Sequence, residues 1–151
     1  KAPNQIMGVY DKSLVEPIAN VLKGLNSRHV MVVHSEDGLD EFSIANKTYV
    51  AELKDNNIST YTVHPHDFGF EEGNLDSIKA ENAEQSLALI NEAFSGKKGV
   101  ARDIIALNAG AAIYVSGLVN SLIEGIQKAN QVLSNGSAKD KLDAYIHASN
   151  S

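Results

Sequence analysis

The chain has 151 residues, 43% of them hydrophobic, which is enough for one sizeable core and too short to suggest two domains. Its 13 basic and 19 acidic residues give a formal net charge of -6, which argues against unspecific binding to nucleic acid or to a membrane surface. The absence of cysteine excludes disulfides and thiolate metal sites and is compatible with a cytoplasmic location. No apolar run approaches the roughly 20 residues that a membrane-spanning helix needs.

The first third of the sequence predicts a βαβ unit. A strand is expected over residues 6–10 and a helix over residues 14–23, with Pro17 in the first turn, where its missing amide is harmless. Four consecutive apolar residues at positions 30–33 predict a second strand that is buried on both faces. Because a helix links the two strands, we expect them to be parallel.

The rest of the sequence predicts a hairpin followed by helices. Residues 47–54 and 58–64 are rich in β-branched and aromatic side chains and flank a turn-type sequence, Asp55-Asn56-Asn57. Helical patterns follow at residues 82–94, 101–115, 121–133 and 141–148. The second of these is small and apolar all round, which is typical of a central buried helix, and Gly110 allows a neighbouring element to approach it closely. Together these patterns indicate an α/β fold.

Polar residues follow the second predicted strand at once, and they include the adjacent acids Asp40 and Glu41. In open α/β sheets, ligands collect beyond the carboxyl ends of the strands. A magnesium ion takes one or two protein carboxylates and completes its shell with water and phosphate oxygens, so this acid pair suits it. From spacing alone, a solvated surface pair or the start of a helix is the commoner explanation.

Other polar residues give weaker signals. His34 is either a general base or a histidine at the end of a strand whose ring bonds to the backbone. His64 and His66 would bind a metal only with further ligands. Arg102 and Asp103 would either contact an anion or form a helix cap and an ion pair. We find no arrangement for nucleophilic catalysis and predict no catalytic residue.

Residues 33–41, with the sequence VHSEDGLDE, resemble the V-H-x-x-D-G-x-D-E signature of the anthranilate phosphoribosyltransferase family. Further matches follow the order and spacing of that family over nearly the whole chain: Gly8-Val9-Tyr10, Leu14-Val15-Glu16-Pro17, Val50-Ala51-Glu52-Leu53, Pro65-His66-Asp67-Phe68-Gly69, Glu81-Asn82-Ala83, Arg102-Asp103 and Leu107-Asn108-Ala109. Several matches in a common order are far more specific than one motif.

The resemblance implies a fold, a reaction and a metal. The fold is the C-terminal portion of a nucleoside phosphorylase/phosphoribosyltransferase-type α/β domain, with parallel strands, a hairpin and packed C-terminal helices. The reaction belongs to tryptophan biosynthesis: the amino group of anthranilate displaces pyrophosphate from 5-phosphoribosyl diphosphate (PRPP). The family's acid pair, here Asp40 and Glu41, binds the Mg²⁺ ions that accompany the diphosphate, and the full-length enzyme is expected to be a homodimer.

The sequence also departs from the family pattern. It lacks the glycine-rich Gly-Thr-Gly-Gly-Asp loop, the lysine-histidine-glycine-asparagine segment, the arginine that meets anthranilate and the N-terminal helical domain. We therefore expect residues 1–151 to form a single incomplete α/β domain that is inactive alone. Two alternatives share the fold by resemblance: a pyrimidine nucleoside phosphorylase-like enzyme and a non-catalytic relative that binds nucleic acid, which the net charge disfavours.

Overall fold

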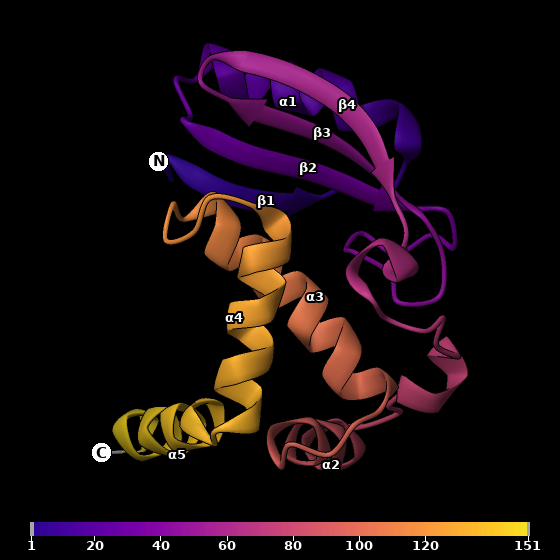
Figure 1. The fold of residues 1–151 in the computed structure, drawn as a ribbon, viewed down its shortest axis with the longest axis vertical. Helices are drawn as coiled ribbons and strands as arrows, with labels where there is room; N and C mark the ends of the chain where they lie inside the picture. Colours follow the sequence, from indigo (N-terminus) through magenta and orange to yellow (C-terminus); the bar gives the residue numbers. More distant parts are fainter. Residues whose placement is uncertain (1, 151) are drawn as a thin grey trace.

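The computed structural model describes residues 2–150, which form a four-stranded sheet with helices on both of its faces (Figure 1). In the order of the sheet, the strands are β1 (Asn4–Gly8), β2 (His29–Ser35), β3 (Thr48–Lys54) and β4 (Asn57–Val63). The α-helices are α1 (Val15–Gly24), α2 (Ala83–Phe94), α3 (Val100–Val115), α4 (Leu122–Ser134) and α5 (Ser137–Ser149). Short 3-10 helices are η1 (Lys12–Leu14), η2 (Pro65–Phe68) and η3 (Leu75–Ile78).

The sheet is mixed, and its pairing confirms the predicted α/β fold. β1 runs parallel to β2, as the βαβ pattern requires, whereas β2–β3 and β3–β4 are antiparallel. The hairpin turns at Asp55 and Asn56, whose φ angles of 50° and 62° lie in the left-handed region that aspartate and asparagine tolerate.

The first strand lies two residues earlier than the sequence predicts, at Asn4–Gly8 in place of residues 6–10. Tyr10 is 82% exposed, and the Asp11 side chain accepts a hydrogen bond from the Ser13 amide that begins η1, so the chain has already turned away from the sheet. Within the described residues β1 is an edge strand, and its residues are half-buried, not fully buried.

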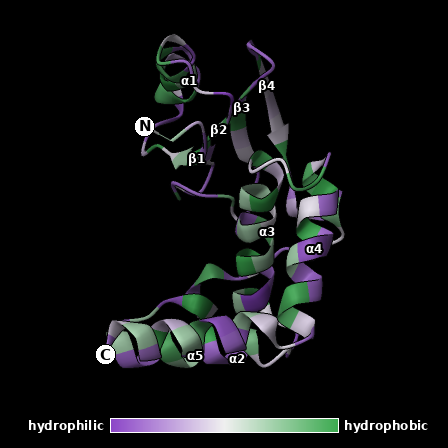
Figure 2. Ribbon diagram, turned by 90° about the vertical axis from the view of Figure 1, so that its left-hand side faces the viewer, coloured by the Kyte–Doolittle hydropathy of each residue, from purple (hydrophilic) through white to green (hydrophobic). Residues whose placement is uncertain are grey.

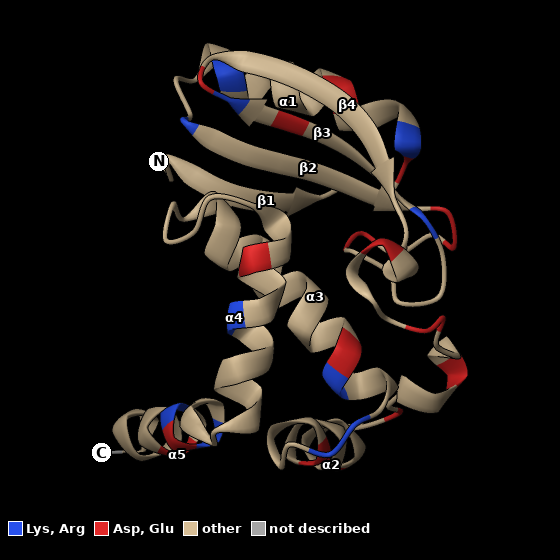
Figure 3. Cartoon of the chain, in the orientation of Figure 1, with Lys and Arg blue, Asp and Glu red and all other residues tan. Residues whose placement is uncertain are grey.

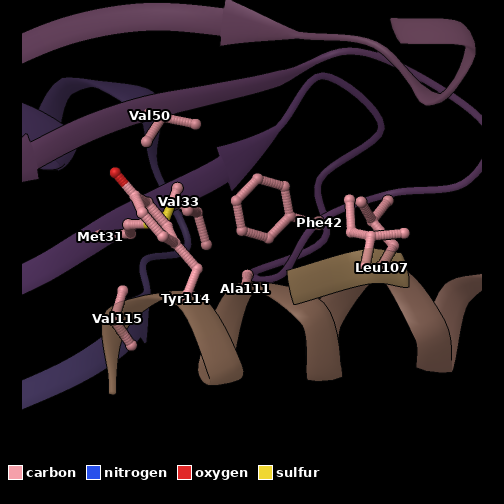
Figure 4. Close-up of a cluster of buried hydrophobic side chains, with 9 residues drawn as sticks. Met31, Val33, Phe42, Val50, Leu107, Ala111, Tyr114 and Val115 are labelled. Carbon is pink, nitrogen blue, oxygen red and sulfur yellow. The ribbon is translucent and has the colours of Figure 1, made fainter. Parts of the chain in front are cut away.

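β2 is buried on both faces, as its run of apolar residues predicts. Val30 and Val32 pack with Ala19 and other residues of α1 on one face of the sheet. On the other face Met31 packs with Leu107 and other residues of α3, where the core side chains interleave between strands and helix (Figure 4).

The helices after the hairpin lead away from the sheet. Figure 1 shows α3 and α4 descending from it, with α2 and α5 at the far end. A Cβ atom on Gly110 would lie 2.5 Å from the Ile126 Cα, and one on Gly125 would lie 2.2 Å from the Gly110 carbonyl oxygen, so glycines let α3 and α4 touch at the backbone. Hydrophilic and hydrophobic residues are mixed along α2 and α5 (Figure 2), and no residue of α5 is buried. Within residues 2–150 no helix is long and apolar enough to cross a membrane.

A buried carboxylate, that of Glu52, ties the sheet to α3 at the end of the sheet remote from the acid pair. Its oxygens accept hydrogen bonds from Tyr61 at 2.7 Å and Tyr114 at 2.8 Å, and one lies 2.8 Å from His29 Nε2. Burial alone would raise the pKa of Glu52, but hydrogen bonds from Tyr61, Tyr114 and His29 outweigh it and lower that pKa. The ionised carboxylate therefore stabilises the fold.

We predict that Glu52→Gln lowers the free energy of unfolding by about 1–3 kcal/mol near pH 7, because it leaves buried hydrogen-bond partners imperfectly satisfied. Since the folded pKa of Glu52 is lowered, its contribution is complete above the unfolded pKa of roughly 4.3 and is lost as the pH falls through the folded value. The deficit of the variant should shrink in acid. Chemical denaturation at several pH values measures the free energy of unfolding of Glu52→Gln and of a control variant at an exposed site, Glu72→Gln. Equal free energies of unfolding for these two variants at every pH would contradict the prediction.

Candidate metal site

The acid pair, Asp40 and Glu41, lies in the loop that follows β2. The Ser35 amide donates to the Leu39 carbonyl at 2.9 Å, and Gly38 turns with φ +90°, so the chain folds back directly beyond the end of the strand. Figure 3 shows acidic residues in the loops at this end of the sheet. The pair therefore lies at the carboxyl end of two parallel strands, where the sequence places it.

On one side the loop rests on the last residue of β1. A Cβ atom on Gly8 would lie only 1.5 Å from the Asp40 carbonyl oxygen and 2.5 Å from its carbonyl carbon. Only a residue without a side chain allows this approach. Gly8 is paired with Val33 in β2, so the sheet itself sets the position of Asp40.

On the other side the loop is held by Asn108 of α3. The Asn108 Oδ1 atom accepts a hydrogen bond from the Phe42 amide at 2.9 Å, and Nδ2 donates to the Phe42 carbonyl at 2.8 Å. The Phe42 ring is fully buried between the strands and α3 (Figure 4). The residue directly after the acid pair is therefore fixed by both its side chain and its backbone.

The loop also has internal supports. Asp37 accepts a hydrogen bond from the Ser43 hydroxyl at 2.5 Å, and the Ser43 amide donates to Thr48 Oγ1 at 3.1 Å. The Ser43 hydroxyl in turn accepts from the amides of Ala45 at 2.9 Å and Asn46 at 3.2 Å. Asp37 therefore stabilises the loop that carries the acid pair.

Both acids of the pair are exposed, but their surroundings differ from open water. Partial burial of the Glu41 carboxyl, and to a lesser extent the charge of Asp40, raise the pKa of Glu41. A divalent cation would relieve this repulsion, and two carboxylate oxygens are the donors that Mg²⁺ prefers. In the part of the chain that the structure describes, no group of three or more His, Cys, Asp or Glu side chains could hold a metal. The pair alone is therefore an incomplete ligand set, although its donor type suits Mg²⁺.

Beside Glu41 lies an open groove of about 680 Å³ between η3, α2 and α3, lined mainly by apolar residues together with Asn108. A larger groove of about 850 Å³ lies between the start of α1 and strands β3 and β4, on the other face of the sheet. The acid pair does not line that larger groove.

The structure also places the weaker candidates. His34 Nδ1 lies 2.9 Å from the Val9 carbonyl oxygen, so the interpretation as a strand-end histidine bonded to the backbone is confirmed. His66 Nε2 lies 3.4 Å from Asp67, and no third ligand side chain joins His64 and His66 within the described residues.

Within residues 2–150, Arg102 forms no ion pair with Asp103, so the second of the two interpretations of the Arg102-Asp103 pair is wrong for the ion pair. Its guanidinium donates to the Asn130 carbonyl at 3.3 Å and to the Ser134 hydroxyl at 2.8 Å. These partners lie in the last turns of α4, so Arg102 caps a neighbouring helix and not its own. The residue is buried against α4, which explains why it turns away from Asp103.

Comparison with known proteins decides the family. Residues 1–139 match the model of the glycosyl transferase family, a/b domain. The chain belongs to this family. The matched range includes the whole sheet, the acid pair and α3.

Individual relatives are more specific. The chain is 60% identical over 149 residues to anthranilate phosphoribosyltransferase of Ruthia magnifica subsp. Calyptogena magnifica, covering 99% of this chain and 44% of that protein. It is 56% identical over 140 residues to the protein of the same name from Marinomonas sp. (strain MWYL1), covering 91% of this chain and 40% of that protein. The chain therefore spans less than half the length of these relatives.

Solved structures agree. Anthranilate phosphoribosyltransferase from Thermus thermophilus superposes with a TM-score of 0.83 at 32% identity, covering 93% of this chain and 41% of that one. The Saccharomyces cerevisiae enzyme in complex with PRPP and Mg superposes with a TM-score of 0.82 at 29% identity, covering 95% and 42%. The fold of this chain is therefore that of part of a phosphoribosyltransferase.

The sequence does not predict that Gly8 and Asn108 hold the loop of the acid pair in place. Gly8 ends an apolar strand, and nothing in its neighbours shows that a loop more than 30 residues later crosses it. Asn108 interrupts an apolar helix, which is the one signal available, because a polar residue on a buried helix needs a partner.

We predict that Gly8→Ala displaces the loop or lowers the free energy of unfolding by about 1–3 kcal/mol, because the new methyl group overlaps the Asp40 carbonyl. Gly24→Ala is the matched control, since a Cβ at Gly24 meets no atom within 4 Å. It should be neutral or slightly stabilising. Denaturation curves and a crystal structure of each variant measure both effects; a Gly8→Ala variant as stable as the control, with an unmoved loop, would contradict the prediction.

Proposed function

We propose that this chain is the C-terminal part of the α/β domain of an anthranilate phosphoribosyltransferase of tryptophan biosynthesis. The observation that carries the proposal is the 60% identity to a protein of that name over 99% of the chain. The sequence VHSEDGLDE lies within the matched region and spans the end of β2 and the loop that follows it. This identity favours the transferase over a nucleoside phosphorylase or a nucleic-acid-binding relative.

In the proposed reaction the amino nitrogen of anthranilate forms a bond to the anomeric carbon of PRPP while the bond from that carbon to the diphosphate oxygen breaks. The nitrogen loses a proton, and pyrophosphate leaves. Negative charge therefore accumulates on the diphosphate, and a bound Mg²⁺ would stabilise it. Such a reaction requires positioning and charge neutralisation, which agrees with a site that offers carboxylates and no nucleophile.

In this proposal Asp40 and Glu41 are the protein ligands of Mg²⁺. Their support is geometric: both lie at the carboxyl ends of parallel strands, both are open to solvent, and the loop that carries them is anchored to β1 and α3. A structure of the yeast relative holds PRPP and Mg, which makes this metal and this substrate the natural choice here.

The same proposal covers the rest of the protein. The chain forms one incomplete domain, and the glycine-rich loop, the anthranilate-binding arginine and the helical dimer contact belong to the full-length enzyme. We therefore expect the 151-residue chain to be inactive alone and the full-length enzyme to be a homodimer. A cytoplasmic location is part of the proposal, because a cysteine-free sequence suits a reducing compartment.

We predict that Asp40→Asn/Glu41→Gln in the full-length enzyme lowers kcat/KM for PRPP by about 10²-fold or more, because the metal contributes several kcal/mol of charge stabilisation. The far-ultraviolet circular dichroism should stay unchanged, since both side chains are exposed. Steady-state kinetics over a range of Mg²⁺ concentrations, with Mg²⁺ titration calorimetry in the presence of PRPP, measures the effect.

The matched control is Glu71→Gln/Glu72→Gln, another exposed pair of adjacent acids in a loop of the same chain. It removes the same charge as the test variant and should leave kcat/KM and the Mg²⁺ dependence within about twofold, because surface substitutions away from such sites have small effects. The metal assignment is wrong if the Asp40 and Glu41 variant behaves like this control.

A further inference from the structure

We infer that Asn108 is a positioning residue that orients the acid pair toward its divalent cation without binding the cation itself. The inference rests on the proposed function, because it needs Asp40 and Glu41 to be metal ligands. Asn108 lies on α3, 66 residues from Phe42 in the sequence, yet its amide bonds to both backbone polar groups of Phe42.

The first step of the argument is which backbone groups are held. The Phe42 amide belongs to the peptide plane that begins at the Glu41 Cα, because a peptide unit is rigid and planar. The 2.9 Å hydrogen bond from this amide to Asn108 Oδ1 therefore fixes the rotation of the plane attached to Glu41. The 2.8 Å bond from Nδ2 to the Phe42 carbonyl fixes the following plane as well.

The second step is that, within residues 2–150, the bond to Asn108 is the directional contact on the peptide plane between Glu41 and Phe42, whereas the next plane is also held by the bond from the Ser43 amide to Thr48 Oγ1. Burial of the Phe42 ring fixes where the residue lies, but hydrophobic burial is non-directional. The contact between Gly8 and the Asp40 carbonyl limits how closely the loop approaches β1. The Asn108 amide is thus the group that sets the backbone orientation directly after the acid pair.

The third step is that both ends of the Asn108 amide are already engaged by backbone groups. Oδ1 is occupied by the Phe42 amide, and Nδ2 donates both to the Phe42 carbonyl and, at 3.1 Å, to the Ile104 carbonyl of the preceding helical turn. The bond to Ile104 ties the side chain to its own helix. Asn108 therefore transmits the position of α3 to the loop, in the way that outer groups orient metal ligands in other sites.

The test compares Asn108→Leu, which keeps the number and branching of the side-chain heavy atoms and removes the hydrogen bonds, with Asn108→Ala, which leaves room for water to bond the freed backbone groups. Both are made in the full-length enzyme. The matched control is Ile113→Ala, which truncates a half-buried residue of the same helix that packs with residues of α4 and does not line the groove beside Glu41. The control reproduces a loss of stability without touching the loop.

The main measurement is the affinity for Mn²⁺, used as a paramagnetic probe, by electron paramagnetic resonance titration in the presence of PRPP. We expect both Asn108 variants to bind Mn²⁺ about tenfold more weakly, the lower end of the losses known for groups that orient metal ligands. The Mg²⁺ concentration that gives half-maximal rate should rise by a similar factor, while KM for anthranilate stays within about twofold. Hydrogen exchange of the loop amides should speed up in the metal-free variants.

Three results would overturn the inference in different ways. If Asp40→Asn/Glu41→Gln abolishes Mn²⁺ binding while the Asn108 variants bind Mn²⁺ with the wild-type affinity, the proposed function stands and the positioning role is wrong. If that double variant leaves Mn²⁺ binding unchanged, the metal assignment fails and the role of Asn108 fails with it. An equal loss of affinity in the Asn108 variants and in Ile113→Ala would show a general effect on stability and would also reject positioning.

Discussion

The candidate site depends on how the chain returns to the core directly after the acid pair. Burying the Phe42 ring contributes about 2–3 kcal/mol, whereas each hydrogen bond from Asn108 to the Phe42 backbone contributes about 1 kcal/mol. Burial is therefore the larger energy, but it does not select a direction. Stability of the loop comes mainly from the ring, and orientation of its backbone comes from the amide.

Helix α3 connects this loop to the rest of the molecule. Leu107 packs on the sheet, Gly110 touches α4 at the backbone, and Asn108 holds the loop. At the far end of the helix, Tyr114 donates to the buried Glu52 carboxylate of β3. Because the C-terminal half of α3 is tied to the sheet region at Asn108 and at Tyr114, a shift of this helix would change the candidate site and the core together.

Patterns among residues that are neighbours in the sequence predict much of the fold. They do not predict the contacts between residues that are distant in the sequence. The apolar run of β2 and the turn at Asp55 and Asn56 are decided by residues that are neighbours in sequence, so both predictions are confirmed. The bounds of β1 depend on the residue at which the chain leaves the edge of the sheet. The hydropathy of the sequence does not predict that residue. Asn108 and its bonds to Phe42 depend on a helix that returns 66 residues later, so the acid pair is visible from the sequence while its supports are not.

Under the proposed function, the position of the acid pair also suits a metal site that this chain supplies only in part. Asp40 crosses the end of β1, which is the edge strand among the described residues. A further parallel strand beside β1 would bring its own carboxyl end next to Asp40, since parallel strands end at a common edge of the sheet. Loops from such a strand would meet the pair directly. The geometry thus suits a site whose phosphate-binding part and metal-binding part come from separate stretches of one sheet.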